Sequence, residues 1–380
     1  MADVLLTVSG NIAPDVEREI AEGQRPCTDY LAMAHAFHAD LADYALARRE
    51  SSWVGWLLAL LGGPNWVLAR YCFRQRHHYG VIFTDGEQVG IPFALLCKLL
   101  GKGDSQHLMI AHILSVRKKM AMMDLFQLQR YIDTFFVYAS WQKQFIEQRW
   151  GVPAARVVFT PFMVDSHFFA PTAAELLAKM EQNAATRKRP LICAVGLECR
   201  DYPTLIKAVR DLEIDVVIAA ASPWSKRADT SAKEALPDNV TVRKFSQYEL
   251  RQLLADSAFM VMPLDNVPFQ AGVTALLEAM AMGKAIICSK TPGQTDVVID
   301  GVTGIYVPPG DVATLRSAIA TLLANPSQAA TMGRAGRRRI ENEMSLEHYT
   351  TRLQGYVQQA LQPKGDRPCA TTTIQSMPPL

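Results

Sequence analysis

Short apolar runs alternate with helical stretches along most of the chain, and turn residues separate them. The runs that we expect to form buried strands are Val4–Ser9, Tyr79–Thr84, His107–Ala111, Thr134–Tyr138, Leu191–Val195, Asp215–Ala220, Val240–Phe245, Ala258–Leu264, Ala285–Ser289 and Ile305–Val307. Helices are expected between them, for example over Ile91–Leu100 and Val312–Leu323. Strands that alternate with helices in this way predict parallel α/β sheets, because two parallel strands need a crossover connection.

The chain of 380 residues is long enough for two domains, each with its own core. Residues 171–190 are polar, rich in Ala, Lys and Arg, and have a proline at each end, which is typical of a linker. We therefore expect one domain over residues 1–170 and a second over residues 191–342. A last helix at 343–362 and a disordered tail at 363–380, rich in Pro and Thr, follow.

The segment Trp53–Ala69 is apolar and contains three tryptophans, and Gly62–Pro64 breaks it in the middle. Neither half reaches the roughly 20 residues that a helix needs to cross a bilayer. Arg48, Arg49 and Arg70 flank the segment. Two interpretations stay open: a pair of core helices, or an interfacial hairpin that makes peripheral membrane contact with its tryptophans and arginines at headgroup level.

Composition and charge are ordinary for a soluble α/β enzyme, with 49% apolar and 20% charged residues. The net charge of +2 gives no reason to expect a nucleic-acid partner. The basic runs Arg337–Arg339 and Arg117–Lys119 are short, and we interpret both as solvated helix faces; contact with an acidic acceptor is the alternative for Arg117–Lys119. The seven cysteines are scattered, odd in number and never spaced Cys-x-x-Cys, which indicates reduced thiols without a zinc site. With no signal peptide at the start, we expect a cytoplasmic protein.

The stretch Pro268–Lys284 joins two of the expected strands and carries the most informative pattern. A polar loop that ends in Gly272 precedes a compact helix, and Gly283 is placed to end that helix. The start of such a helix presents unpaired amides to an anion. Inside the helix, Glu278 has apolar neighbours on both sides. Its carboxylate either points to water, the common outcome for a lone glutamate, or holds a specific ligand.

This stretch resembles the signature of glycosyltransferase family 4, in which two glutamates separated by seven residues precede A-M-A-x-G-x-P-V-I. Here L-E-A-M-A-M-G-K-A-I-I matches the second half, with Glu278 as the second acid. The first acid falls on Gln270, which can hydrogen-bond a sugar hydroxyl but carries no charge. The resemblance covers most of the chain and is strongest over residues 258–310. It implies the GT-B fold, in which two Rossmann-like domains face each other across a cleft and a C-terminal helix crosses back to the first domain.

The resemblance also implies roles for individual residues. The expected donor-binding residues are Gly10, Arg200, Lys226, Phe245, Tyr248, Gly272, Val273, Thr274 and Glu278. Arg200 matches a basic residue that pairs with the donor diphosphate. The second base is Lys226 or the neighbouring Arg227, with plain surface charge as the alternative for either. Glu278 is expected on the ribose hydroxyls, and the segment with Phe245 and Tyr248 resembles the loop that holds the nucleotide base.

The catalytic candidates are His112, Gln270, Arg200 and Lys226. His112 stands where a strand gives way to a loop, and family 4 enzymes often carry a sugar-contacting histidine at a comparable place; a purely structural histidine is the alternative. Gly10 follows the first strand, at the end of a sheet where ligands gather. An ordinary turn explains this glycine equally well.

The activity that the resemblance implies is transfer of a hexose from a UDP- or GDP-sugar to the hydroxyl of a small-molecule or lipid-linked acceptor, held by the first domain, with retention of the anomeric configuration. The sequence has no Asp-x-Asp pair to hold a metal, so we expect no metal and no cofactor. Two alternatives stay open: a nucleotide-sugar epimerase of the same fold, and a partner subunit without activity, because Gln270 replaces an acid. A phosphorylase would need a cofactor lysine and a longer chain.

Overall fold

The computed structural model describes residues 2–51, 60, 62–170, 189–220 and 236–362. Contacts divide the chain into two units: unit 1 comprises Met1–Ala13, Asp29–Thr160 and Thr350–Leu380, and unit 2 comprises Pro14–Thr28 and Pro161–Tyr349. The boundary after Thr160 precedes the one expected at residue 170. The expected linker and tail lie outside the described residues, apart from their edges.

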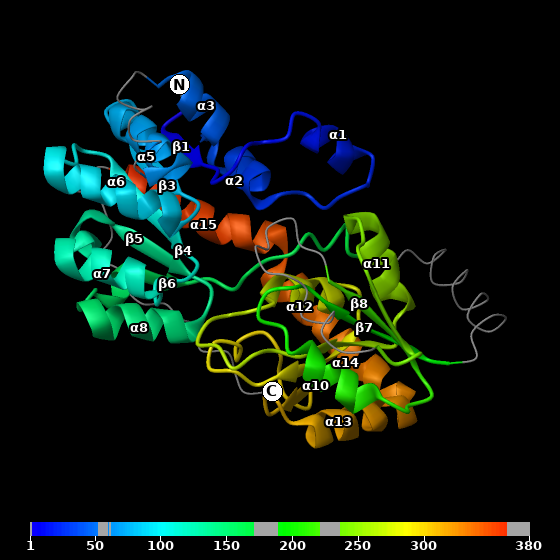
Figure 1. Cartoon of the computed structure of the whole chain (residues 1–380). Helices are drawn as coiled ribbons and strands as arrows, with labels where there is room; N and C mark the ends of the chain where they lie inside the picture. The colour runs from blue at the N-terminus through cyan, green and yellow to red at the C-terminus, as the bar shows by residue number, and fades with distance from the viewer. Residues whose placement is uncertain (1, 52–59, 61, 171–188, 221–235, 363–380) are drawn as a thin grey trace. The chain divides into compact units, whose positions relative to one another are not determined.

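Unit 1 is built on a six-stranded parallel sheet in the order β2-β1-β3-β4-β5-β6 (Figure 1). Its strands are β1 (Val4–Thr7), β2 (Asp40–Ala42), β3 (Val81–Thr84), β4 (Gln106–Ala111), β5 (Thr134–Val137) and β6 (Val157–Phe159). The central strands β1, β3 and β4 are buried along their whole length, which explains their continuous apolar runs. The strand order reverses between β1 and β3, because β2 lies on one side of β1 and all later strands on the other.

The helices of unit 1 are α2 (Asp29–Phe37), α3 (Tyr44–Arg49), α5 (Pro64–Gln75), α6 (Glu87–Leu100), α7 (Arg117–Phe126) and α8 (Ser140–Trp150), with short 3₁₀ turns at Leu128–Tyr131 and Ala154–Arg156. Helix α5 contains the described end of the tryptophan-rich segment. Its residues Val67, Leu68 and Ala69 are buried in the core of this unit together with Phe93 of α6. Residues 52–59 and 61 of the segment lie outside the described residues. Within the part of the chain that the structure describes, no helix is long and apolar enough to cross a membrane.

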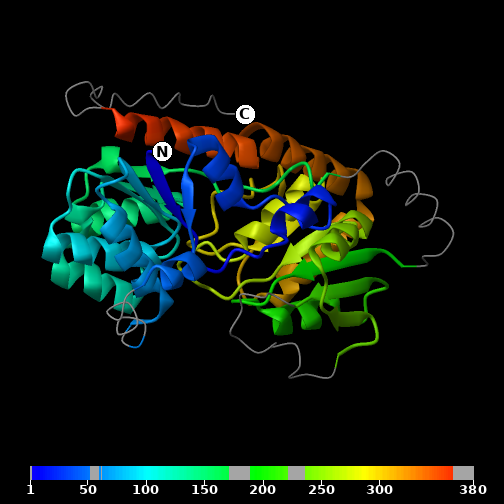
Figure 2. The same ribbon diagram turned by 90° about the horizontal axis from the view of Figure 1, so that it is seen from above.

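Unit 2 is built on a second six-stranded parallel sheet, in the order β12-β11-β10-β7-β8-β9. Its strands are β7 (Leu191–Val195), β8 (Asp215–Ala219), β9 (Val240–Arg243), β10 (Phe259–Met262), β11 (Ala285–Ser289) and β12 (Gly304–Val307). Its helices are α1 (Val16–Ala21), α10 (Tyr202–Val209), α11 (Gln247–Asp256), α12 (Val273–Ala281), α13 (Val312–Ala324) and α14 (Pro326–Arg339), the last followed by a π-helical turn (Ile340–Met344). Helices α13 and α14 pack against β11 and β12. In Figure 2 the chain runs on from α14, in orange, toward the last helix, in red. The strand order of this sheet reverses between β7 and β10.

The last helix, α15 (Leu346–Leu361), begins in unit 2 and belongs to unit 1 from Thr350 onward. Its Tyr356 ring packs edge-on against Phe136 of β5, with ring centroids 5.5 Å apart. The sequence places this helix at 343–362 and expects it to cross back to the first domain. In the structure the α-helix starts at Leu346, after the π-helical turn, and ends at Leu361.

The interpretation of Arg337 and Arg339 as solvated side chains is wrong. Both guanidinium groups donate to backbone carbonyls from other segments. The acceptors are the carbonyl oxygens of Ser166 (3.2 Å), Phe169 (2.7 Å) and Ala281 (2.6 Å) for Arg337, and those of Asp296 (2.8 Å) and Val297 (3.0 Å) for Arg339. Carbonyls in loops and at helix ends have no helical partner, so a charged donor from another segment satisfies them. Arg338, between the two, is exposed as expected.

Candidate functional site

The loops that leave β7 and β10 are joined where the strand order of unit 2 reverses. The backbone N–H of Asp265 donates to the carbonyl of Cys199 (3.0 Å), and Arg200 and Leu264 form an antiparallel bridge. The carboxyl end of β11 adds a third connection, because Oγ of its last residue, Ser289, accepts a hydrogen bond from the N–H of Leu264 (3.0 Å). Ligands of open parallel sheets bind outside such a reversal point, so we take these three loops as the candidate site.

Arg200 is the buried cation of this site, with 8% of its surface exposed. Its Nε donates to the carbonyl of Val195 (3.0 Å) and its Nη1 to that of Glu198 (2.6 Å). The remaining nitrogen, Nη2, lies against two glycines: a Cβ on Gly196 would overlap it, and a Cβ on Gly272 would lie 3.1 Å from it. Burial lowers the pKa of Arg200, but a guanidinium stays protonated in proteins. The three loops therefore hold a fixed positive charge.

That charge lies at the start of α12. Gly272 is the N-cap residue of this helix, with φ of 76°, and no side chain caps the helix. Val273 is half-buried and Thr274 is exposed. The first amides of a helix have no partner within the helix, and the helix dipole makes this end positive. Arg200 and the start of α12 together form a receptor for an anion.

Glu278 lies in the second turn of α12 and is 6% exposed. Burial raises the pKa of its carboxyl group to about 8. Within the described residues, the carboxyl group has no hydrogen-bond or ion-pair partner. A desolvated carboxylate without a protein partner is costly, and such groups gather at functional sites. Glu278 is therefore largely buried and not a solvated side chain on the helix surface, and its role as a ligand-binding residue stays a prediction.

Gln270 lies in the loop before Gly272, and its Oε1 is buried without a hydrogen-bond partner among the described residues. Two further side chains near this loop were missed by sequence reasoning, Thr291 and Gln294. Gln294 Nε2 donates to the carbonyl of Ala271 (2.8 Å). In the sequence, residues 291–293 predict a turn. This local pattern does not identify the loop that the turn contacts.

The other residues of unit 2 that the sequence predicts to bind the nucleotide-sugar are less buried or lie outside the described residues. Phe245 is half-buried, and the guanidinium of Arg243 lies 4.3 Å from its ring centroid. Tyr248 is 46% exposed in the first turn of α11, after a capping box formed by Ser246 and Glu249. Lys226 and Arg227 fall in residues 221–235, outside the described residues, so their role stays a prediction.

In unit 1, His112 follows β4 as predicted, and both its ring and its backbone make hydrogen bonds. His112 Nε2 lies 2.9 Å from the carbonyl oxygen of Asp85, which follows β3. The backbone N–H of His112 donates to Glu87 Oε2 (2.8 Å). Gly10, after β1, donates to the carbonyl of Val8 (2.8 Å), and a Cβ on Gly10 would meet nothing within 4 Å. The reversal point of this sheet therefore holds an oriented imidazole beside an open turn.

Glu87 holds the loop that carries His112. Its carboxylate is 1% exposed and also accepts hydrogen bonds from the N–H of Ile113 (3.2 Å) and from Lys119 Nζ (2.5 Å). Burial alone would raise the pKa of Glu87, but the positive charges of His112 and Lys119 lower it overall. The interpretation of Lys119 as a solvated side chain is wrong, because it pairs with this buried carboxylate. Asp85 is held as firmly, by Thr7 Oγ1 (2.6 Å) and Ser9.

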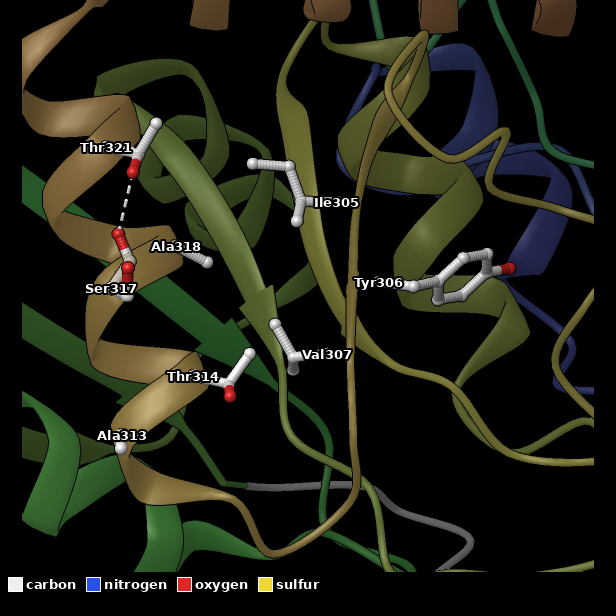
Figure 3. A pocket seen from close by; sticks show the side chains of 8 residues that line it. All are labelled: Ile305, Tyr306, Val307, Ala313, Thr314, Ser317, Ala318 and Thr321. Carbon is white, nitrogen blue, oxygen red and sulfur yellow. Dashed lines mark hydrogen bonds between the residues drawn. The ribbon is translucent and has the colours of Figure 1, made fainter.

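A surface hollow of about 510 Å³ lies elsewhere, between the edge strand β12 and α13 (Figure 3). Val307 lines it from the strand, and Thr314, Ser317 and Thr321 line it from the helix. Thr321 Oγ1 donates to the carbonyl of Ser317 (2.9 Å), and Tyr306 points away from the hollow. None of the described residues that line it has a charged side chain. Within the described residues there is also no group of three or more His, Cys, Asp or Glu side chains that could hold a metal ion.

The comparison with known families decides what kind of domain holds the first site. Residues 178–339 match the family of glycosyl transferases group 1. The chain therefore carries a group 1 glycosyltransferase domain. This domain contains Arg200, Gln270, Gly272 and Glu278. Membership of family 4 in particular stays a prediction.

Two relatives of the group 1 domain are mannosyltransferases by name. The GDP-mannose-dependent alpha-(1-6)-phosphatidylinositol monomannoside mannosyltransferase of Mycolicibacterium smegmatis is 26% identical over 216 residues, which cover 53% of this chain and 55% of the relative. The human alpha-1,3/1,6-mannosyltransferase ALG2 is 32% identical over 120 residues, 32% of this chain and 28% of the relative. The chain thus spans about half or less of the length of these curated relatives.

Solved structures confirm the fold over nearly the whole chain. Anabaena HepE, solved in complex with UDP and glucose, superposes with a TM-score of 0.68 at 14% identity, covering 94% of this chain and 100% of that one. Sucrose-phosphate synthase from Thermosynechococcus elongatus gives a TM-score of 0.68 at 18% identity, with 94% and 98% covered. The two parallel six-stranded sheets with their helices match these GT-B structures, as the sequence predicted.

Proposed function

We propose that the chain is a glycosyltransferase that moves a hexose from a UDP- or GDP-sugar to a hydroxyl acceptor. The observation that carries the proposal is the position of Arg200, whose guanidinium lies against Gly272 at the start of α12. A fixed cation and the free amides of a helix start suit the diphosphate of the donor. The match of residues 178–339 to glycosyl transferases group 1 supports this donor class, as does the UDP bound to Anabaena HepE.

The proposed reaction retains the anomeric configuration. The bond from the anomeric carbon to the diphosphate breaks, and a bond to the acceptor oxygen forms on the same face of the sugar. The acceptor's proton passes to the departing diphosphate, so no protein nucleophile is required. Arg200, the amides of α12 and Lys226 stabilise the negative charge that grows on the leaving group. The neutral amide of Gln270 and the imidazole of His112 hold sugar hydroxyls, and no step involves a metal or cofactor.

The nucleoside part of the donor is proposed to lie over the rest of α12 and the start of α11. The carboxylate of Glu278 accepts hydrogen bonds from the ribose hydroxyls, which gives this buried group the partners that the described residues do not provide. Phe245 and Tyr248 contact the base.

For the acceptor we propose a lipid or a lipid-linked compound, reached at the cytoplasmic membrane face through Trp53–Ala69. The Mycolicibacterium relative has phosphatidylinositol monomannoside in its name, which supports this choice. A soluble acceptor is the alternative, favoured by the burial of Val67 and Leu68 in the core. Co-sedimentation with anionic vesicles at low salt tests the proposal. We expect the protein to sediment with the vesicles; a protein that stays in the supernatant has a soluble acceptor.

The activity itself is tested by measuring release of UDP or GDP from a panel of nucleotide-sugars, with and without a cell extract as a source of acceptor. We expect release from one class of donor and stimulation by the extract. The anomeric proton of the product, followed by NMR, reports the stereochemistry, and an inverted centre would rule out the proposed mechanism. Tight binding of nucleotide without any release would instead favour the partner-subunit alternative.

A further inference from the structure

The turn between β11 and β12 holds the loop that carries Gln270. Gly293 lies so close to the backbone of Phe269 that a Cβ at residue 293 would overlap the Phe269 carbonyl group. Beside it, Gln294 Nε2 donates a hydrogen bond to the carbonyl of Ala271 (2.8 Å). These contacts fix the residues on both sides of Gln270, and they come from a segment that the proposed function does not use.

The same place holds buried polar atoms that have no partner. Gln294 is fully buried and Thr291 is 1% exposed. Within the described residues, Gln294 Oε1, Thr291 Oγ1 and Gln270 Oε1 have no hydrogen-bond partner. A buried polar atom left unpaired costs stability, and natural structures have few of them. Losing the hydrogen bond from Gln294 Nε2 to the carbonyl of Ala271 would add two further unpaired buried atoms, which makes this contact costly to break.

We propose that Gln294 is a positioning residue that determines which sugar the enzyme accepts. It acts by holding Ala271, and through Ala271 the adjacent Gln270, at a fixed place beside the donor sugar. The reason lies in the neutral side chain at residue 270. A neutral amide forms a weaker hydrogen bond with a hydroxyl than a carboxylate does, and the strength of this bond decreases steeply when its distance or angle departs from the optimum. The selectivity of the amide for one sugar therefore depends on its accurate placement. This inference rests on the proposed function.

The test is Gln294→Met, which keeps the length of the side chain and removes its hydrogen bonds. We expect the ratio of kcat/KM between two donors epimeric at one sugar hydroxyl to fall by about tenfold, since small displacements at a reacting group have effects of this size. The Kd for UDP or GDP alone should stay within about twofold, because the diphosphate receptor is formed by other residues. In a Gln270→Ala background the same substitution should leave the donor ratio unchanged, because Gln294 affects the donor sugar only through Gln270.

Asn239→Leu provides the matched control. Asn239 Nδ2 also donates to backbone carbonyls of unit 2, those of Val209 (3.0 Å) and Leu212 (3.2 Å), at the start of β9. It should lower stability without changing the donor ratio. A donor ratio that stays at the wild-type value in Gln294→Met overturns the inference. A loss of affinity for free UDP or GDP as large as the fall in the donor ratio also overturns it.

A second measurement does not depend on activity. Hydrogen exchange of the amides in residues 264–272 should accelerate in Gln294→Met and stay unchanged in Asn239→Leu. Unchanged exchange in Gln294→Met overturns the positioning role. If the wild-type chain releases no nucleotide from any donor, the proposed function fails, and the exchange measurement still decides whether Gln294 holds the loop.

Discussion

The pKa of Glu278 leads to a prediction about the pH dependence of donor binding. The carboxyl group is 6% exposed, and burial raises its pKa from 4.5 to about 8. The ionised carboxylate accepts a hydrogen bond on each oxygen, whereas the protonated group donates from one of them, so the proposed acceptance from two ribose hydroxyls is made by the ionised form. Below pH 8 the free protein therefore releases a proton when the donor binds.

The raised pKa of Glu278 sets the size of its effect on protein stability and on donor binding. At about 1.4 kcal/mol per pKa unit, the change from 4.5 to about 8 corresponds to roughly 5 kcal/mol. The folded-state pKa lies above the unfolded one, so as the pH rises the unfolded chain loses its proton first. The free protein loses this stability progressively between about pH 4.5 and pH 8, and the whole cost is present above pH 8. For donor binding, the same linkage predicts that Kd rises by up to about tenfold for each unit by which the pH falls below 8.

Titration calorimetry with UDP-glucose and GDP-mannose at pH 6, 7 and 8 measures the Kd and the number of protons released on binding. Nucleotide-sugars are suitable because their diphosphate has no ionisation in this range, unlike free UDP. Repeating the titration in buffers of different ionisation enthalpy should show release of nearly one proton at pH 7 for the wild-type protein. Glu278→Gln should bind more weakly at pH 8, with a pH-independent Kd and no proton release, and should be more stable than the wild type at pH 8 without ligand.

Two results would refute this reasoning. A wild-type Kd that is constant from pH 6 to pH 8 would show that binding is not linked to ionisation of Glu278. Equal affinity of the wild type and Glu278→Gln for both donors at pH 8 would show that the carboxylate does not touch the nucleotide. In either case the buried carboxyl group would be neutral and structural, and the ribose would lie elsewhere.

Other substitutions test the two reversal points and the backbone. Arg200→Ala should lower turnover by about 10²-fold, the usual loss for one charge-stabilising donor; near-normal turnover would place the diphosphate in another loop. Glu87→Gln should lower the free energy of unfolding by about 2 kcal/mol, measured in urea at pH 7, because Lys119 loses its buried partner. Since the folded pKa of Glu87 is lowered, this difference should shrink as the pH falls below about 4; a constant difference would contradict the pairing. Gln127→Gly should raise the free energy of unfolding by about 0.5–1 kcal/mol, because Gln127 ends α7 with φ of 49°; Gln127→Ala should give no gain.

Ten of the twelve described strands could be predicted from local sequence; β2 and β6, the three-residue edge strands of the first sheet, could not. The run Ala285–Ser289 has the bounds of β11, and the helix expected between Gly272 and Gly283 is α12. A strand covered on both faces must be apolar at every position, and a helix after a glycine-bearing loop has a recognisable start and end. Local sequence also placed Arg200 in a loop after a strand. Its position against Gly272 depends on β7 and β10 being neighbours, which the strand order decides.

Only the tertiary structure decided which polar side chains hold the site together. In the sequence, Arg337 and Lys119 belong to solvated basic runs, and Gln294 follows an ordinary turn. In the structure, Arg337 donates to three carbonyls of two other segments, and Lys119 pairs with Glu87. Gln294 holds the carbonyl of Ala271. A buried carbonyl or carboxylate takes its donor from whichever segment the fold brings near, and a partner distant along the chain leaves no local pattern to recognise.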